Sequence, residues 1–149
     1  MLFRSLLLDP AAATVLLTRQ FRYPVYANGD PAWLIEVCAG LLDGEEPAIA
    51  ASREAVEETG YRPVTLDHVF DAYMSPGSLT EKIACFVGSY VSGSPENAGG
   101  GLEDEGEDIE VLELPLSTAL TMIKTGKITD GKTIMLLQWA ALNRPELVR

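Results

Sequence analysis

The segment "CAGLLDGEEPAIAASREAVEETGY", residues 38–61, carries the clearest structural pattern in this chain. It begins in an apolar, strand-like run and continues through a short polar stretch, "DGEE", into residues with helical spacing. Apolar and polar side chains separate onto two faces over residues 46–59, and Gly60 is a typical helix terminator. We therefore expect a strand that leads through a turn into a helix ending at Thr59.

Three carboxylates crowd the last turns of this expected helix. Glu54, Glu57 and Glu58 lie at positions i, i+3 and i+4, so they share one face. Like charges at that spacing cost about 0.2–0.5 kcal/mol, and a carboxylate near a helix C-terminus costs about 0.3–1 kcal/mol more. A solvated acidic face would tolerate this, and Arg53 offsets part of the charge. A divalent cation such as Mg²⁺ or Mn²⁺ would balance it better, because both prefer oxygen ligands and pair with substrate phosphates.

Composition narrows the class of protein. The chain has 149 residues, of which 47% are hydrophobic and 22% charged, which suits a single globular domain over residues 1–149. A formal charge of −11 argues against nucleic acid as a partner. No apolar run approaches the roughly 20 residues of a membrane span, and the N-terminus lacks the cleavage site of a secretory signal. We expect no membrane partner and a cytoplasmic location.

Cysteine and histidine chemistry is sparse. Cys38 and Cys85 lie inside apolar, strand-like runs, so we expect two reduced core cysteines. His68 is the only histidine and lies in a strand-like segment. These counts argue against a Cys/His zinc site and against a Ser-His-Asp triad.

The rest of the chain alternates strands and helices irregularly, which favours a mixed sheet flanked by helices. We expect turns over residues 23–32, a loop over 74–81 and a mobile surface loop over 92–101, "SGSPENAGGG". The expected strands cover residues 2–8, 14–21, 33–39, 64–74, 82–91 and 109–114, and the expected later helices cover 116–126 and 131–143.

Residues 53–61, "REAVEETGY", match the second half of the Nudix box, G-x5-E-x7-R-E-U-x-E-E-x-G-U, where U is apolar. Segment 38–61 as a whole resembles this box. From Gly40 to Arg53 the spacing is one residue short, so either Glu45 or Glu46 can fill the position of the first glutamate.

The resemblance extends along most of the chain. The branch that hydrolyses nucleoside diphosphate sugars, closest to the bacterial GDP-mannose hydrolases, is similar in four further segments. Related UDP-sugar and ADP-ribose pyrophosphatases share the acidic one. The segments are "LIEVCAGLLD" (34–43), "YMSPG" (73–77), "GGGLEDEGEDIEVLELPL" (99–116) and "IKTGKITDGKT" (123–133).

This resemblance implies an α/β (α+β) Nudix fold with a mixed β-sheet sandwiched between helices. It also implies Mg²⁺-dependent hydrolysis of the pyrophosphate bond of a nucleoside diphosphate sugar such as GDP-mannose, with Mn²⁺ as a possible substitute. The products would be a nucleoside monophosphate and a sugar 1-phosphate. ADP-ribose or a UDP-sugar as the substrate, and a catalytically silent Nudix binding domain, are the alternatives.

The resemblance also implies roles for individual residues. Glu54 and Glu58 would bind metal, with Glu57 shared or next to the metal and Arg53 orienting the glutamates. The implied further metal ligands are Glu107 and the backbone carbonyl of Ala39.

Three further segments complete the implied site. Glu105 would be the general base that activates the attacking water. Arg22, and after it Arg19, would contact the diphosphate. Tyr73, Met74 and Ser75 would shape the sugar side, or would simply form a packed loop.

Relatives in this branch usually carry an N-terminal strand region that swaps across a homodimer and helps to bind the base. The present chain is expected to begin after that region. We therefore expect an exposed edge or apolar patch near residues 2–8 that needs covering. The resemblance also implies a possible homodimer, but one without the swapped region of the relatives.

Overall fold

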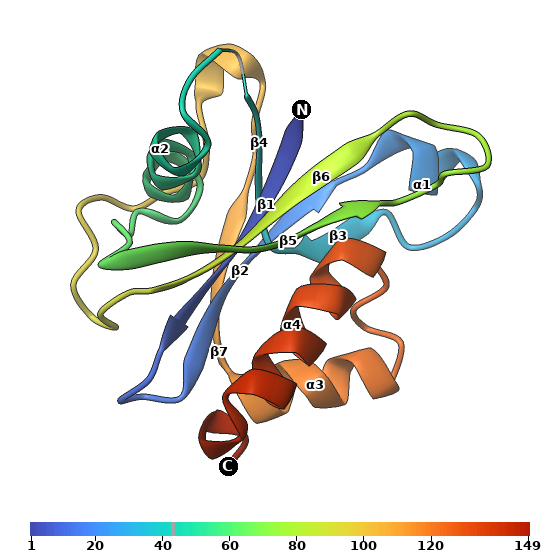
Figure 1. The fold of residues 1–149 in the computed structure, drawn as a ribbon. Coiled ribbons are helices and arrows are strands. Elements are labelled where there is room, and N and C mark those ends of the chain that lie inside the picture. Colours follow the sequence, from blue (N-terminus) through green and yellow to red (C-terminus); the bar gives the residue numbers. More distant parts are fainter. Residues whose placement is uncertain (43) are drawn as a thin grey trace.

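The structure is a computed structural model that describes residues 1–42 and 44–149. Asp43, which closes the segment "LIEVCAGLLD", lies outside the described residues. Figure 1 shows a sheet with helices on both faces. The strands are β1 (Leu2–Asp9), β2 (Thr14–Phe21), β3 (Trp33–Glu36), β4 (Cys38–Leu41), β5 (Thr65–Tyr73), β6 (Lys82–Ser89) and β7 (Glu110–Pro115). The helices are α1 (Tyr23–Ala27), α2 (Pro47–Thr59), α3 (Leu116–Lys124) and α4 (Gly131–Asn143), with short 3-10 turns η1 (Glu103–Glu105) and η2 (Pro145–Leu147).

The expected mixed sheet between helices is confirmed. Strands β1 and β6 run parallel, whereas the other strand pairs are antiparallel. Helix α2 covers one face, and α3 and α4 cover the other (Figure 1). Successive side chains of β1 point to opposite faces of the sheet, which gives the protein a core on each face. Phe3 and Leu7 pack with α2, while Leu6 and Leu8 join the larger core under α3 and α4.

The sheet divides at its centre. Strands β1 and β2 pair only near their hairpin, where residues 7–9 face residues 14–16. Beyond that point the segment β3–β4 fills the gap, with β3 paired to β2 and β4 paired to β1. Val37 lies between the two short strands and belongs to neither. The single strand expected over residues 33–39 is therefore two strands that join different neighbours.

Two expectations from the sequence are wrong. Strand β1 is no exposed edge, because β6 pairs with residues 2–8 on one side while β4 and β2 share the other. Its side chains from Phe3 to Asp9 are buried, so the apolar run is interior. The turn segment 23–32 also opens with a short helix, α1, which tolerates Pro24 because a first helical turn needs no amide donor there.

Helix α2 forms where the sequence predicted it. Its buried side chains include Ala50, Ala51 and Ala55, whose small size allows the helix to lie close to the sheet. The Glu46 carboxylate caps the first turn by accepting hydrogen bonds from the amides of residues 48 and 49 at 3.1 and 3.2 Å. At the other end Gly60 has the left-handed φ of 81° that ends many helices.

Gly60 is also packed too closely for a side chain. A Cβ atom there would lie 2.1 Å from the carbonyl oxygen of Asn97. We expect Gly60→Ala to lower the free energy of unfolding by about 2–3 kcal/mol, because a left-handed φ and a backbone clash act together. Urea unfolding would measure the loss. Gly77→Ala is the matched control, since its Cβ would meet nothing within 4 Å; equal midpoints for the two variants would contradict the prediction.

The expectation of two core cysteines is confirmed. Cys38 and Cys85 are both free and buried. No helix among residues 1–42 and 44–149 has the length and apolar character to cross a bilayer.

Candidate active site

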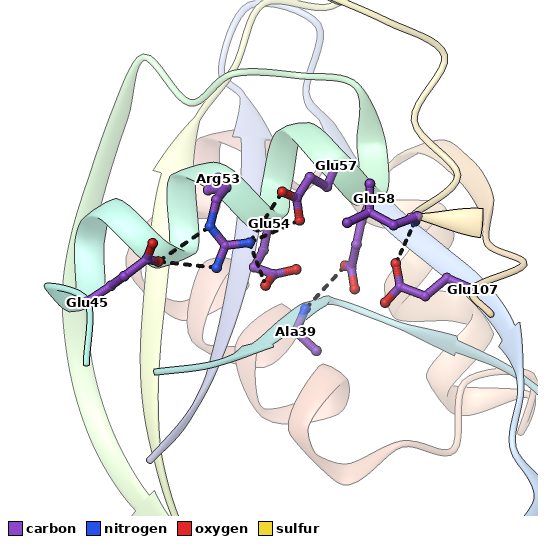
Figure 2. A network of polar contacts seen from close by, with 8 residues as sticks. Ala39, Glu45, Arg53, Glu54, Glu57, Glu58 and Glu107 are labelled. Atoms are coloured by element: carbon purple, nitrogen blue, oxygen red, sulfur yellow. Dashed lines mark hydrogen bonds and ion pairs between the residues drawn. The ribbon is translucent and has the colours of Figure 1, made fainter. Parts of the chain in front are cut away.

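Arg53 binds Glu45, Glu54 and Glu57, and Figure 2 shows these side chains beside Glu58 and Glu107, with which they form the acidic network. Its guanidinium lies 3.1 Å from carboxylate oxygens of Glu45, Glu54 and Glu57. The hydrogen bond with Glu45 and the charges of the other two glutamates raise the pKa of Arg53. The geometry thus identifies the partner that spacing left open, because Glu45 pairs with Arg53 while Glu46 caps the helix.

Glu58 is the most deeply buried carboxylate of the network, with 3% of its surface exposed. Its Oε2 accepts a hydrogen bond of 3.2 Å from the amide of Ala39 in β4. Burial raises the pKa of Glu58 to about 8, and the charges of Glu54 and Glu107 act in the same direction. A cation bound beside this buried carboxylate would stabilise its ionised form.

Ala39 faces the same space through its backbone. In a strand, the N–H and C=O of one residue point to the same edge, as the exchange of paired hydrogen bonds requires. Because the Ala39 amide points to Glu58, its carbonyl is directed to that side as well. This orientation fits the predicted use of the carbonyl as a metal ligand.

Glu54 lies one turn before Glu58 and is half-buried. Burial raises its pKa, while Arg53 opposes the shift. Glu54 also packs tightly against β4, because a Cβ at Gly40 would lie 2.7 Å from the Glu54 Cγ and 2.4 Å from the Phe3 ring. A glycine at position 40 is thus what lets the helix bring this carboxylate to the strand.

The glycine-rich segment brings the acidic loop to the end of α2. The amides of Gly100 and Gly101 donate to the carbonyls of Glu58 and Glu57 at 2.9 and 3.0 Å. These bonds satisfy carbonyls that every helix C-terminus leaves without a partner. The glycines, which we predicted for mobility, thus have a structural role in capping the helix.

Glu107 reaches the network from this loop. Figure 2 shows its carboxylate facing that of Glu58. Its Oε2 accepts a hydrogen bond of 2.8 Å from the amide of Leu102, which holds the side chain across the loop. Glu105 is different: it is exposed on η1, and among the described residues it has no side-chain hydrogen bond or ion pair. The structure therefore brings Glu107 to the glutamates of α2 and leaves Glu105 at the rim.

The two predicted substrate arginines are both paired. Arg22 binds Glu36 through two hydrogen bonds, Nε–Oε1 at 2.7 Å and Nη2–Oε2 at 2.9 Å. The hydrogen bond with Glu36 raises the pKa of Arg22, and the charge of Glu58 adds to this. Arg19 lies 2.5 Å from Glu110 and is half-exposed. Arg22 thus has a fixed direction and a remaining Nη1 group that these two bonds do not use.

A pocket of about 880 Å³ lies beside Arg19, which is within the size range of small-molecule sites. Its lining combines Trp33, Val25 and Met122 with the charged side chains of Lys127 and Asp130. A smaller hollow shares Arg19 and Trp33 with this pocket and is also bordered by Asp108 and Glu110 of the acidic segment. Another hollow of about 480 Å³ follows the outer side of α2 and is bordered by neither Glu58 nor Ala39.

The segment Tyr73–Ser75 is absent from the described lining of this pocket, although Met74 lies behind Gly131, one of its lining residues. Tyr73 is exposed at the end of β5, and Met74 packs against the main core. The Ser75 hydroxyl forms a 2.8 Å hydrogen bond with Ser78. These contacts favour the packed-loop interpretation over a role in shaping the sugar side.

The donor set suits a hard divalent cation. Carboxylates of Glu54, Glu58 and Glu107, together with a backbone carbonyl, offer oxygen atoms only. Burial, and after it the charges of Glu54 and Glu107, raise the pKa of Glu58, so a bound cation would favour its ionised form. Among the described residues no three acidic, histidine or cysteine side chains lie in an arrangement that could hold a metal ion as they stand, so metal binding would require these carboxylates to draw together. The residues fit Mg²⁺ in chemistry, and its binding remains a proposal.

Sequence reasoning missed Glu36, although the sequence holds a signal for it. Glu36 is 3% exposed and is the charged member of the apolar run "WLIEVCA". A buried carboxylate requires a charged partner, which the bidentate pair with Arg22 supplies.

A carboxylate-rich helix end beside an acidic loop is typical of proteins that act on phosphate compounds with the help of metal ions. Comparison with known proteins identifies the family. The model of the NUDIX domain matches residues 3–137. The chain therefore belongs to the Nudix family.

Similar proteins carry a more specific name. A protein of Pectobacterium atrosepticum named GDP-mannose pyrophosphatase is 53% identical over 138 residues, which are 92% of this chain and 70% of that protein. A protein of the same name from Escherichia coli O1:K1 / APEC is 51% identical over 139 residues, covering 93% of this chain and 72% of the relative.

Proposed function

We propose that this protein hydrolyses the pyrophosphate bond of a nucleoside diphosphate sugar, with GDP-mannose as the substrate. The observation that carries the proposal is the buried Glu58 held against Ala39, with Glu54, Glu107 and the Arg22–Glu36 pair around it. The relatives named GDP-mannose pyrophosphatase support the choice of substrate.

Glu54, Glu58, Glu107 and the Ala39 carbonyl would hold Mg²⁺, or Mn²⁺ in its place. Such ions neutralise diphosphate oxygens and make a water molecule easier to deprotonate. Arg53 has a supporting part, because it binds Glu54 and Glu57 and so limits their rotamers. We propose that Glu57, like Arg53, supports the metal ligands without binding the metal itself, and that its charge adds to the negative field around the metal.

The substrate would lie between the network and the pocket beside Arg19. Arg22 would donate to a diphosphate oxygen through Nη1, which its two bonds to Glu36 do not use, while Glu36 holds the guanidinium in place. Glu105 would remove a proton from the attacking water as the water oxygen bonds to one phosphorus. The bond from that phosphorus to the bridging oxygen breaks, and the products are GMP and mannose 1-phosphate.

Three substrates tested in parallel would examine this function. We expect GMP and mannose 1-phosphate from GDP-mannose in Mg²⁺, and neither product when a chelator replaces the metal. UDP-glucose and ADP-ribose should react more slowly. Faster hydrolysis of UDP-glucose or ADP-ribose would make that compound the preferred substrate in place of GDP-mannose. No hydrolysis of any of the three would favour a silent binding domain.

We also propose that residues 1–149 act as one domain in the cytoplasm and that two copies associate. Four exposed aromatic side chains gather near α1, and clusters of this kind are often covered in assemblies. They are Phe21, Tyr23, Tyr26 and Trp33.

A further inference from the structure

The break between β3 and β4 is held from the opposite face of the sheet. Val37, which lies at the break, donates its amide to the hydroxyl of Thr133 in α4 at 2.9 Å. Both residues are buried, with 1% and 0% of their surface exposed. Helix α4 covers the face that lies away from α2 and the acidic network (Figure 1).

Asp130 fixes the direction of this contact. Its Oδ2 accepts from the Thr133 hydroxyl at 2.8 Å and from the Thr133 amide at 2.9 Å, while Oδ1 pairs with Lys132. Burial raises the pKa of Asp130, but the bonds from Lys132 and Thr133 outweigh it and the net pKa is lowered. Asp130 is thus ionised and can only accept. The Thr133 hydroxyl therefore donates to Asp130 and receives the Val37 amide on its oxygen.

The residues on either side of the break belong to the candidate active site. Glu36, just before Val37, orients Arg22 through two hydrogen bonds, and its carbonyl accepts from the Thr18 hydroxyl at 3.2 Å. Ala39, two residues after Val37, donates to Glu58. A shift at Val37 would therefore move the arginine and the backbone ligand together.

We propose that Thr133 is a positioning residue, which anchors the β3–β4 break from the far side of the sheet and thereby aims Ala39 and Glu36 at the metal and the diphosphate. Thr133 is absent from the described lining of the pocket beside Arg19, so it would act on catalysis without touching substrate. The predicted effect of Thr133 on catalysis rests on the proposed function. Its effect on the position of Val37 rests on the hydrogen bonds alone.

The test compares Thr133→Val, which keeps the shape and removes the hydroxyl, with Thr133→Ser, which keeps the hydroxyl. We expect the valine variant to bind Mn²⁺, followed by electron paramagnetic resonance, about tenfold more weakly, as for other losses of support behind a metal ligand. Amide hydrogen exchange should become faster at Val37 and Ala39. The serine variant should restore both readouts to within about twofold.

Leu137→Val is the matched control, because it trims a buried side chain of the same helix without a bond to Val37. It should lower the melting temperature and leave Mn²⁺ affinity unchanged. A Thr133→Val variant that is folded and binds Mn²⁺ like the wild type would overturn the proposal, as would failure of the wild type to bind Mn²⁺. A wild type that binds Mn²⁺ but hydrolyses no nucleotide sugar would sink only the proposed function.

Discussion

Glu58→Gln is expected to lower kcat for GDP-mannose by at least about 100-fold, as when a group that stabilises transition-state charge is removed. The amide keeps the size of the side chain and can still accept from Ala39, so the local packing should survive. Stability should be equal or higher, because the variant no longer buries a carboxylate beside Glu54 and Glu107. Steady-state kinetics at saturating Mg²⁺ and a thermal melt would measure both effects.

The opposite changes in activity and stability distinguish a ligand from a structural residue. Substitution of a residue that only supports the fold would lower activity and stability together. Glu146→Gln is the control, since that carboxylate is exposed and pairs with Arg144 near the C-terminus. Wild-type turnover in Glu58→Gln would refute the assignment of Glu58 to the metal.

Glu105→Gln is expected to reduce kcat by about 100-fold or more, within the range of 10²–10⁴ that positioned general bases contribute. The KM and the affinity for Mn²⁺ should change little, because Glu105 lies on the exposed turn η1 and contacts none of the proposed ligands. Kinetics in Mg²⁺, together with Mn²⁺ titration, would separate loss of the base from loss of the metal.

The neighbours of Glu105 provide the comparison. Glu103→Gln and Asp104→Asn remove one charge each from the same 3-10 turn, so they alter the local field to a similar extent. Both should retain at least about half of the activity, as exposed substitutions usually have small effects. If one of them, and not Glu105→Gln, abolishes turnover, the base belongs to that neighbour.

Much of the fold could be predicted from local pattern. Strand β6 and helices α2 and α4 lie close to the expected ranges, because each has an apolar face of regular period with turn residues at its ends. The error about an exposed edge at residues 2–8 has a nonlocal cause. A run of apolar residues such as 2–8 does not say how many strands will flank it, and β6, which covers one side, lies about 80 residues away in sequence.

The candidate site could likewise be predicted only in part from the sequence. Helical spacing alone placed Glu54, Glu57 and Glu58 on one face, and their approach to Arg53 follows from it. Spacing could not choose between Glu45 and Glu46, because both are within reach of the helix start in an irregular turn. Only the folded turn assigns Glu45 to Arg53 and Glu46 to the cap.

The sequence by itself determined the acidic helix, its stop at Gly60 and the family to which the chain belongs, since these depend on residues near one another in the chain. Tertiary structure alone decided that Glu58 is buried against Ala39, that Glu36 holds Arg22 and that Thr133 anchors the β3–β4 break. Those contacts join segments that are 14 to 96 residues apart. Burial and hydrogen bonding between such segments arise only when the whole sheet is packed between its helices, which no local pattern specifies.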